Sequence, residues 1–210
     1  MKKLVLKVLS VGLLSALLLP QSAGADTSGV LFPFHNGSFN QLTPSLLGAR
    51  NSSMVDEARC NGKVDYNFTN VVGAKDTYSI DLSSVPNGAI LTGIDIIPCA
   101  SENLNQGNLR SRMNVFYRLN GNNGPMSGNY ALPAGDPVEL AQAQFAGLSV
   151  IKNNNTSLQV GAVLSAGNRG MRLSHMAVVL TYAPMPAPTN VIGLSSGNRV
   201  TVIRTYNAKT

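Results

Sequence analysis

The sequence predicts an all-β protein whose main part, residues 26–183, folds as an antiparallel β-sandwich. Apolar and polar residues alternate with a period of two in several segments, clusters of turn residues separate these segments, and no stretch shows a strong helical pattern. The composition agrees, because 20 Gly, 11 Pro and a charged fraction of only 12% in 210 residues suit strands and turns better than helices.

Residues 1–25 have the three-part layout of a cleavable signal peptide. Lys2, Lys3 and Lys7 form a basic start, an uncharged apolar run follows from residue 8 to residue 20, and Ala23-Gly24-Ala25 offers the small residues that a signal peptidase accepts. The apolar run is shorter than the roughly 20 residues that a membrane-spanning helix needs. We therefore expect a secreted or cell-surface protein with no membrane span after cleavage.

The alternation identifies individual strands in chain order. In Arg112–Asn120 the residues Met113, Val115, Tyr117 and Leu119 share one face, which indicates a half-buried strand. The same pattern predicts half-buried strands over Thr77–Leu82 and Ser157–Ser165. Ile90–Ile97 and Leu173–Tyr182 are apolar on both faces, which is typical of central strands, and Pro137–Leu148 fits either a helix or an edge strand.

Turn residues lie between these strands. Pro86-Asn87-Gly88 precedes the first apolar segment, and the run Asn120–Pro125 follows the segment that begins at Arg112. Two further clusters, residues 153–155 and 167–170, precede the later strands. Such residues supply positive φ angles or a preset turn geometry, so each cluster is predicted to be a loop.

The composition changes near Tyr182, where a Pro-rich stretch begins. We expect a linker over residues 184–189 and two short strands after it, Thr189–Leu194 and Arg199–Thr205. Pro188-Thr189-Asn190-Val191 and Val200-Thr201-Val202-Ile203 resemble the opening of a fibronectin type III domain, although Arg204 stands where that family has Trp. The resemblance implies that residues 190–210 hold at most the first two of the seven strands of such a domain.

The main domain also resembles a known kind of module. Val85–Ile96 is similar to a "Pro-x-Gly-Ala-x-Ile-x-x-Ile" stretch of secreted bacterial jelly-roll modules, and the region from Cys60 to Tyr182 resembles uncharacterised modules that precede fibronectin-like domains in bacterial surface proteins. The resemblance implies a jelly-roll-like sandwich with an extracellular role. It carries no catalytic residue to this chain.

The two cysteines, Cys60 and Cys99, are predicted to form a disulfide. Both lie in the part of the chain that is expected to be exported, where thiols are oxidised. The alternatives are a reduced buried pair and a metal site, but two Cys without a neighbouring His make a poor zinc site. We expect no cofactor and no metal.

The charge distribution argues against nucleic-acid binding. The net charge is +6 for 16 basic and 10 acidic residues, but three of the basic residues belong to the expected signal peptide and three to residues 184–210. Residues 26–183 hold ten basic and ten acidic residues. A nucleic-acid-binding protein would show a clustered basic face, so we expect no nucleic-acid partner.

Several residues could carry chemistry, and each has a plainer interpretation. Gly193–Gly197 matches the Gly-x-Ser-x-Gly string of esterases but lies between two predicted strands rather than before a helix. His175 lies in an apolar strand without a nearby acid, as a packed residue would. Asp56 and Glu57, with Asp65 nearby, are either acid–base groups, solvated turn charges or calcium ligands. We predict no catalytic residue.

A speculative ligand site follows from the aromatic residues. Sugar-binding faces commonly stack an aromatic ring on the sugar, and Tyr117 and Tyr130 flank a segment that contains Asn122 and Asn123. The plainer reading makes Tyr117 a core residue and Tyr130 incidental. We expect a non-catalytic binding or structural module whose partner is a cell-surface glycan or an extracellular protein; the alternatives are a carbohydrate-binding module of a secreted enzyme and a small secreted hydrolase.

Overall fold

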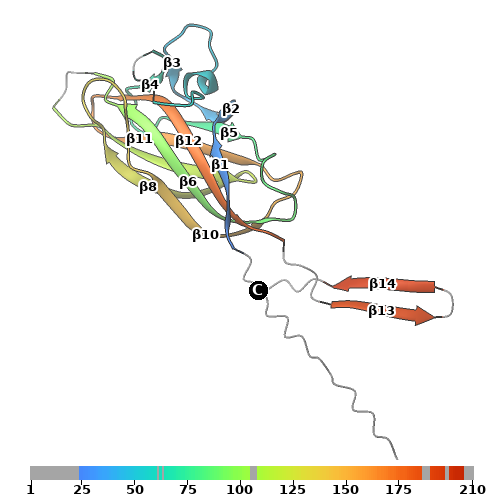
Figure 1. Ribbon diagram of the computed structural model, residues 1–210. Coiled ribbons are helices and arrows are strands. Elements are labelled where there is room, and N and C mark those ends of the chain that lie inside the picture. Colours follow the sequence, from blue (N-terminus) through green and yellow to red (C-terminus); the bar gives the residue numbers. More distant parts are fainter. Residues whose placement is uncertain are drawn as a thin grey trace, which may run out of the picture.

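Two antiparallel β-sheets pack face to face and form the main body of the protein (Figure 1). The computed structural model describes residues 24–60, 62, 64–104 and 108–185, together with the backbone of residues 190–196 and 199–205. The first sheet, sheet A, contains β1 (Asp26–Leu31), β3 (Thr43–Pro44), β4 (Asn67–Thr69), β6 (Ile90–Ser101), β9 (Val138–Glu139), β10 (Ala143–Ile151) and β12 (Met171–Ala183).

Sheet B has five strands in the order β2-β5-β11-β7-β8. Their bounds are Pro33–Asn40 for β2, Lys75–Ile80 for β5, Leu158–Ala166 for β11, Arg112–Leu119 for β7 and Asn122–Ala131 for β8. A short 3-10 helix, η1 (Asn51–Met54), lies between β3 and β4. The protein is thus an all-β sandwich, as predicted.

The order of the strands makes this sandwich a jelly roll. Eight strands (β4, β5, β6, β7, β8, β10, β11 and β12) pair as β4 with β12, β5 with β11, β6 with β10 and β7 with β8. The first strand therefore pairs with the last, the second with the seventh, and so on inwards, which is the arrangement of two Greek keys wrapped around one core.

The core forms from the residues that the alternation placed on one face. Met113, Val115, Tyr117 and Leu119 of β7 are all buried, as are Leu158, Val160, Ala162 and Leu164 of β11. They pack against sheet A, whose strands β6 and β12 lie side by side in the middle of that sheet. Both strands were predicted to be central from their continuous apolar sequence, and this prediction is confirmed.

One ambiguous segment and part of one predicted loop form edge strands, so the loop prediction is wrong for residues 122–125. The segment 137–148 forms β9 and most of β10, and β10 pairs only with β6, so the helical alternative is wrong. The predicted loop 120–125 is confined to Asn120 and Gly121, whose φ angles of 52° and 81° make the tight turn of the β7–β8 hairpin. Pro125 fits into β8 because an edge strand does not need every backbone N–H.

A buried carboxylate, that of Asp76, connects the segment from Gln41 to Asn51 to the core. Asp76 of β5 is fully buried and accepts hydrogen bonds from the backbone N–H groups of Gln41 and Leu42 and from the side chains of Asn51 and Tyr78. Burial raises the pKa of Asp76, and the hydrogen bonds from Asn51, Leu42, Gln41 and Tyr78 oppose that rise. The four donors hold the connection between β2 and η1 against sheet B.

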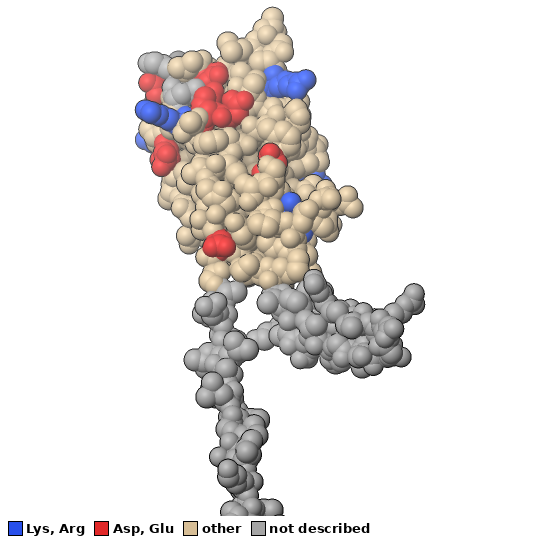
Figure 2. All heavy atoms as spheres, turned by 45° about the vertical axis from the view of Figure 1, so that its right-hand side comes forward, with Lys and Arg blue, Asp and Glu red and all other residues tan. Residues whose placement is uncertain are grey.

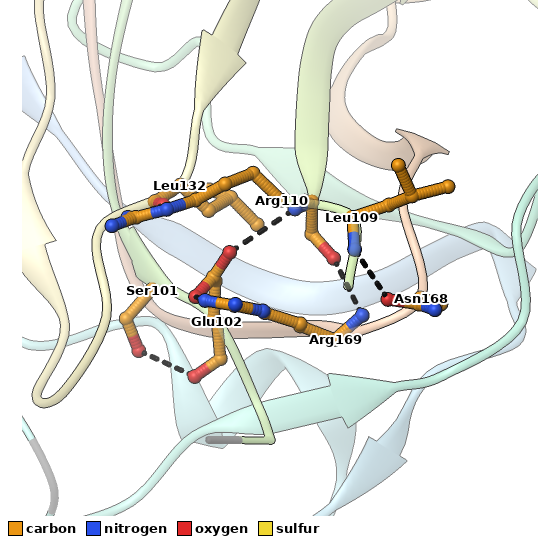
Figure 3. A network of polar contacts seen from close by, with 8 residues as sticks. Ser101, Glu102, Leu109, Arg110, Leu132, Asn168 and Arg169 are labelled. Atoms are coloured by element: carbon orange, nitrogen blue, oxygen red, sulfur yellow. Dashed lines mark hydrogen bonds and ion pairs between the residues drawn. The ribbon is translucent and has the colours of Figure 1, made fainter. Parts of the chain in front are cut away.

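A second polar network ties together the loops at one end of the sandwich (Figure 3). Glu102, which is 1% exposed, follows β6; its carboxylate lies 3.1 Å from Nη1 of Arg169 and accepts a hydrogen bond of 3.1 Å from the backbone N–H of Ser111. The Ser111 hydroxyl in turn accepts from the backbone N–H of Arg169. The loops before β7 and β12 are therefore fixed to the end of β6.

The predicted disulfide between Cys60 and Cys99 is present, with 5.6 Å between the Cα atoms. It fastens the loop between η1 and β4 to β6 and closes a loop of 39 residues. In the chain-entropy model such a loop stabilises the fold by about 4 kcal/mol.

The remaining sequence predictions concern the two ends of the chain. The expected signal peptide covers residues 1–25, of which residues 1–23 lie outside the described residues, and β1 begins at Asp26. After the Pro-rich stretch, of which residues 186–189 are also outside, β13 (Asn190–Ser196) and β14 (Arg199–Thr205) pair antiparallel. The structure does not test their likeness to fibronectin type III strands. None of the helices among the described residues could cross a membrane.

Candidate functional site

A row of five polar residues crosses the outer face of sheet B from one edge to the other. Register pairs His35 with Ser79, Ser79 with Gln159, Gln159 with Arg118, and Arg118 with Asn123. In β5, β11 and β7 the neighbours of these residues along the chain, such as Tyr78, Leu158 and Tyr117, are buried in the core. Because successive side chains alternate between faces, the row lies on the solvent side. We call these five residues the polar row.

Hydrogen bonds order the middle of the polar row. The guanidinium of Arg118 donates to Oδ1 of Asn123 (2.8 Å) and to Oε1 of Gln159 (3.3 Å). The same Gln159 oxygen accepts from the backbone N–H of Ser38 at 3.1 Å. The oxygen of the Gln159 side chain is thus held in place from both sides, which fixes the amide for hydrogen bonding to a ligand.

A shallow groove of about 360 Å³ opens at the β2 end of this row. Its walls come from β5, from the loop after β5, and from the loop between β10 and β11. Most of the lining side chains carry a hydroxyl or an amide; the lining residues are Phe34, Ser79, Ile80, Asp81, Leu82, Ser83, Lys152, Asn153, Asn154, Thr156, Ser157, Leu158 and Gln159. The volume lies at the lower end of the range for small-molecule sites.

Phe34 is the aromatic side chain of the groove. It belongs to β2, is 50% exposed, and its ring lies 4.6 Å from the ring of His35. A flat apolar ring beside hydroxyl and amide groups is the combination that a sugar requires, because a sugar has an apolar face and an edge of hydroxyls. The groove can therefore hold a sugar with one face on Phe34.

The two charged groups of the groove are fixed by neutral partners. Asp81 accepts hydrogen bonds of 2.9 Å from both the backbone N–H and the hydroxyl of Ser83. These two bonds, helped by the positive charge of Lys152, lower the pKa of Asp81 below its usual range. Nζ of Lys152 donates to Oδ1 of Asn87 at 2.7 Å. Asp81 is therefore ionised at neutral pH and accepts hydrogen bonds from hydroxyl groups.

Next to the row, a bulge of β2 lays Phe39 over the same face. Phe39 and Phe116 of β7 meet edge to face at 6.4 Å, and the backbone N–H of Phe39 donates to the hydroxyl of Thr77. Two cations contact the Phe39 ring: Nζ of Lys75 lies 4.0 Å and Cζ of Arg118 lies 5.0 Å from its centroid. The outer face of sheet B thus combines aromatic, amide and cationic groups.

The structure separates the four residues proposed from sequence as a ligand site. Tyr117 is 8% exposed and its ring meets that of Phe145 edge to face at 5.1 Å, so it is part of the core and offers no stacking surface. Tyr130 is half-buried, and burial raises its pKa. Asn122 and Asn123 are exposed residues of β8, not of a loop, and only Asn123 lies in the polar row.

Sequence reasoning missed Phe34 because its partners are remote in the chain. The segments 81–83 and 152–159, which form the groove with it, are brought to Phe34 only by the pairing of β2, β5 and β11. One feature of the sequence could have indicated the groove. Asn153-Asn154-Asn155 and Ser83-Ser84 are hydroxyl- and amide-rich loops beside strands of one sheet.

A cluster of acids lies elsewhere, in the loop that carries Cys60. Figure 2 shows acidic side chains gathered near the upper end of one face of the molecule, most of which bears no charge. Burial is the main cause that raises the pKa of Glu57 to about 7, and a hydrogen bond with Asp65 and the charges of Asp65 and Asp56 add to the rise. At neutral pH Glu57 therefore keeps a proton part of the time.

His175 lies beneath this loop and is 3% exposed. Its ring is 5.8 Å from that of Phe32, and burial lowers its pKa, although a hydrogen bond to the backbone of Glu57 and the charge of Glu139 oppose the shift. Its Nδ1 is buried without a hydrogen-bond partner among the described residues. Neither of the surface hollows at residues 79–83 and 71–74 is lined by His175 or by the acidic cluster of Asp56, Glu57 and Asp65.

The other candidate motifs do not assemble into a site within the described structure. In that part of the chain, no three His, Cys, Asp or Glu residues are placed to hold a metal ion together. The Gly-x-Ser-x-Gly string begins within β13, and its last residue, Gly197, falls outside the described residues.

Comparison with known proteins gives no family for this chain. No family model and no curated protein matches the sequence. Similar solved structures include a GH26-CBM35 β-(1,4)-mannanase of Podospora anserina (18% identity, TM-score 0.35, 82% of this chain), the CBM36-1 domain of a xylanase from the hindgut metagenome of Trinervitermes trinervoides (10%, 0.34, 66%) and latent PorU of Porphyromonas gingivalis (12%, 0.38, 73%).

The chain spans 30%, 95% and 14% of those three chains, respectively. At these identities and TM-scores the likeness assigns no function to this chain.

Proposed function

We propose that this protein is a secreted, non-catalytic carbohydrate-binding module that holds a glycan in the groove beside Phe34. The observation that carries the proposal is the half-exposed Phe34 ring in a groove lined by Ser, Thr, Asn and Gln side chains. An aromatic ring excludes water from the apolar face of a sugar, while the surrounding oxygens and amides bind its hydroxyl groups.

Hydrogen bonds hold the groove in a fixed conformation, so the binding site is preorganised for its ligand. Gln159 is held by Ser38 and Arg118, and the loop that bears Asn154 is joined to the loop after β5 by a hydrogen bond of 2.6 Å from Asn87. A preformed site loses less conformational entropy on binding than a flexible one. The disulfide between Cys60 and Cys99 is consistent with an extracellular location.

Depletion by insoluble polysaccharides tests this proposal. Wild-type protein mixed with cellulose, xylan, mannan or chitin is expected to leave the supernatant with at least one of these polymers. Phe34→Ala is expected to weaken that binding by about tenfold or more, because it removes the apolar anchor of the site. The variant should fold normally, since the ring is half exposed.

Leu47→Ala is the matched control. Leu47 is a fully exposed apolar residue in the loop after β3, away from the groove. Its loss should leave binding unchanged. Equal binding by wild-type protein and Phe34→Ala, or retention by none of these polymers and by none of the soluble ones used below, would contradict the proposal.

A further inference from the structure

The charged residues that lie within strands differ in sign between the two sheets. The strands of sheet B contain Lys75, Arg112 and Arg118, and their one acid, Asp76, is fully buried among hydrogen-bond donors. The strands of sheet A contain three acids, Asp26, Asp95 and Glu139, and the single base Arg172. The outer face of sheet B is therefore the cationic side of a domain whose charges balance overall.

Among the described residues, the cation in the middle of the polar row, Arg118, has no acidic hydrogen-bond partner. The guanidinium of Arg118 makes three hydrogen bonds in the described structure, to Asn123 Oδ1, Gln159 Oε1 and the carbonyl oxygen of Gly121. All three acceptors are neutral. Nζ of Lys75 lies 4.0 Å and Cζ of Arg118 lies 5.0 Å from the centroid of the Phe39 ring, so both positive charges stand beside one aromatic ring. An anion bound next to that ring would be attracted to both.

The polar row connects these cations to the groove. Ser79 and Gln159 line the groove, and Gln159 is the register neighbour of Arg118. The step from Ser79 on β5 to Arg118 on β7 crosses two strand spacings, or about 10 Å. A linear oligosaccharide with one unit on Phe34 can therefore place the substituent of a following unit at Arg118, which contacts the same Phe39 ring as Lys75.

We propose that the ligand is an anionic polysaccharide, whose carboxylate or sulfate groups bind at Arg118 and Lys75 while a neighbouring sugar lies on Phe34. This inference rests on the proposed function and deepens it. The acid of the groove, Asp81, belongs to the loop after β5, where it lies near Lys152. The negative group of the ligand accordingly binds on the β7 side of the groove.

A pair of polymers with the same backbone tests the proposal. Homogalacturonan in its de-esterified form carries carboxylates, and in its highly methyl-esterified form those charges are masked. By affinity electrophoresis, wild-type protein is expected to bind the de-esterified polymer about tenfold more tightly, with a preference that falls as NaCl is added. A comparison of dextran sulfate with dextran tests binding of sulfate groups in the same way. The two pairs of polymers together show whether the protein prefers carboxylate or sulfate.

Variants of single cationic residues test which side chains bind the negative groups of the ligand. Lys75→Gln is expected to reduce the preference for the charged polymer severalfold and to leave binding of its neutral counterpart unchanged. Arg118→Gln is expected to reduce the same preference and also to weaken binding of the neutral polymer, because Arg118 helps to hold Gln159. Arg59→Gln is the matched control, because it removes one exposed positive charge from the loop of Cys60 and none from sheet B. Since Arg118 also supports the β7–β8 turn through Gly121, Lys75→Gln decides the result if Arg118→Gln does not fold.

The outcomes separate the two proposals. Equal binding of charged and neutral polymers, with loss of both in Phe34→Ala, would overturn the anionic ligand and leave the carbohydrate-binding function standing. Retention of none of these polymers, nor of the insoluble ones, would overturn both. Equally tight, salt-sensitive binding of polyuridylate would show a general polyanion surface and would also overturn the inference.

Discussion

Exposure decides what an aromatic side chain can do in this protein. Tyr117 and Phe34 both lie in strands of sheet B, but Tyr117 is 8% exposed and packs on Phe145, whereas Phe34 is 50% exposed and lines a groove. The alternation of β7 predicted the burial of Tyr117 directly. Nothing in the local sequence around Phe34 predicts its exposure, because the loops that meet it come from distant segments.

Glu57 gives a residue-scale prediction about pH. The pKa of its carboxyl rises from 4.5 to about 7 on folding, so the folded state favours the protonated form. The stability that this group contributes is full below pH 4.5 and is lost as the pH rises to about 7 and beyond. Glu57→Gln should therefore match the thermal midpoint of wild type near pH 4 and exceed it above pH 7.

The neighbouring His175 has the opposite dependence, which the variant leaves in place. Its pKa is lowered from 6.5, so its contribution is full above pH 6.5 and is lost as the pH falls through the lowered value. Thermal unfolding of both proteins between pH 4 and pH 8 isolates Glu57 as the difference between the curves. A difference that does not change with pH would contradict the raised pKa.

At the scale of the elements, Glu102 joins the ends of three strands. Glu102→Ala removes a buried carboxylate and leaves the backbone N–H of Ser111 and the guanidinium of Arg169 without that acceptor. The expected loss is about 3–5 kcal/mol in the free energy of unfolding. Chemical denaturation measures it, and Glu139→Ala, at an exposed site of β9, should change the value by less than about 0.5 kcal/mol. Similar losses in both variants would refute the role of the Glu102 network.

The half-buried strands that the sequence predicted each bury one face in the core. Thr77–Leu82, Arg112–Asn120 and Ser157–Ser165 alternate because each buries every second residue, and the structure contains them as β5, β7 and β11. The missed strands β1, β2 and β8 are largely exposed along their length. Because most of their residues are exposed to solvent on both faces, their sequences show no alternation of apolar and polar residues.

The buried polar networks were also beyond sequence reasoning. Asp76 and Glu102 look like surface charges in the sequence, but the first is fully buried and the second 1% exposed. Each is stabilised by donors from segments that the topology brings together, such as Asn51 for Asp76 and Arg169 for Glu102. The disulfide was predictable, because two cysteines in a chain that is expected to be exported have only each other as partners.

At the scale of the whole molecule, the sandwich is expected to be stable without the residues that follow it. Among the described strands, β13 and β14 pair only with each other, whereas Met185 touches the turn at Gly88. Removing residues 186–210 should therefore leave the thermal midpoint of the sandwich within a few degrees of that of the full chain. A larger drop in differential scanning calorimetry would show that these residues belong to the same cooperative unit.

The central claim is that the outer face of sheet B binds a glycan at Phe34, and nuclear magnetic resonance tests it most directly. Backbone amide shifts are recorded while cello-, xylo-, manno- and galacturono-oligosaccharides are added in turn. The account predicts saturable shifts for at least one of them, concentrated in residues 79–83 and 152–159 and absent in Phe34→Ala. Saturable shifts concentrated instead around Glu57 and His175 would contradict it.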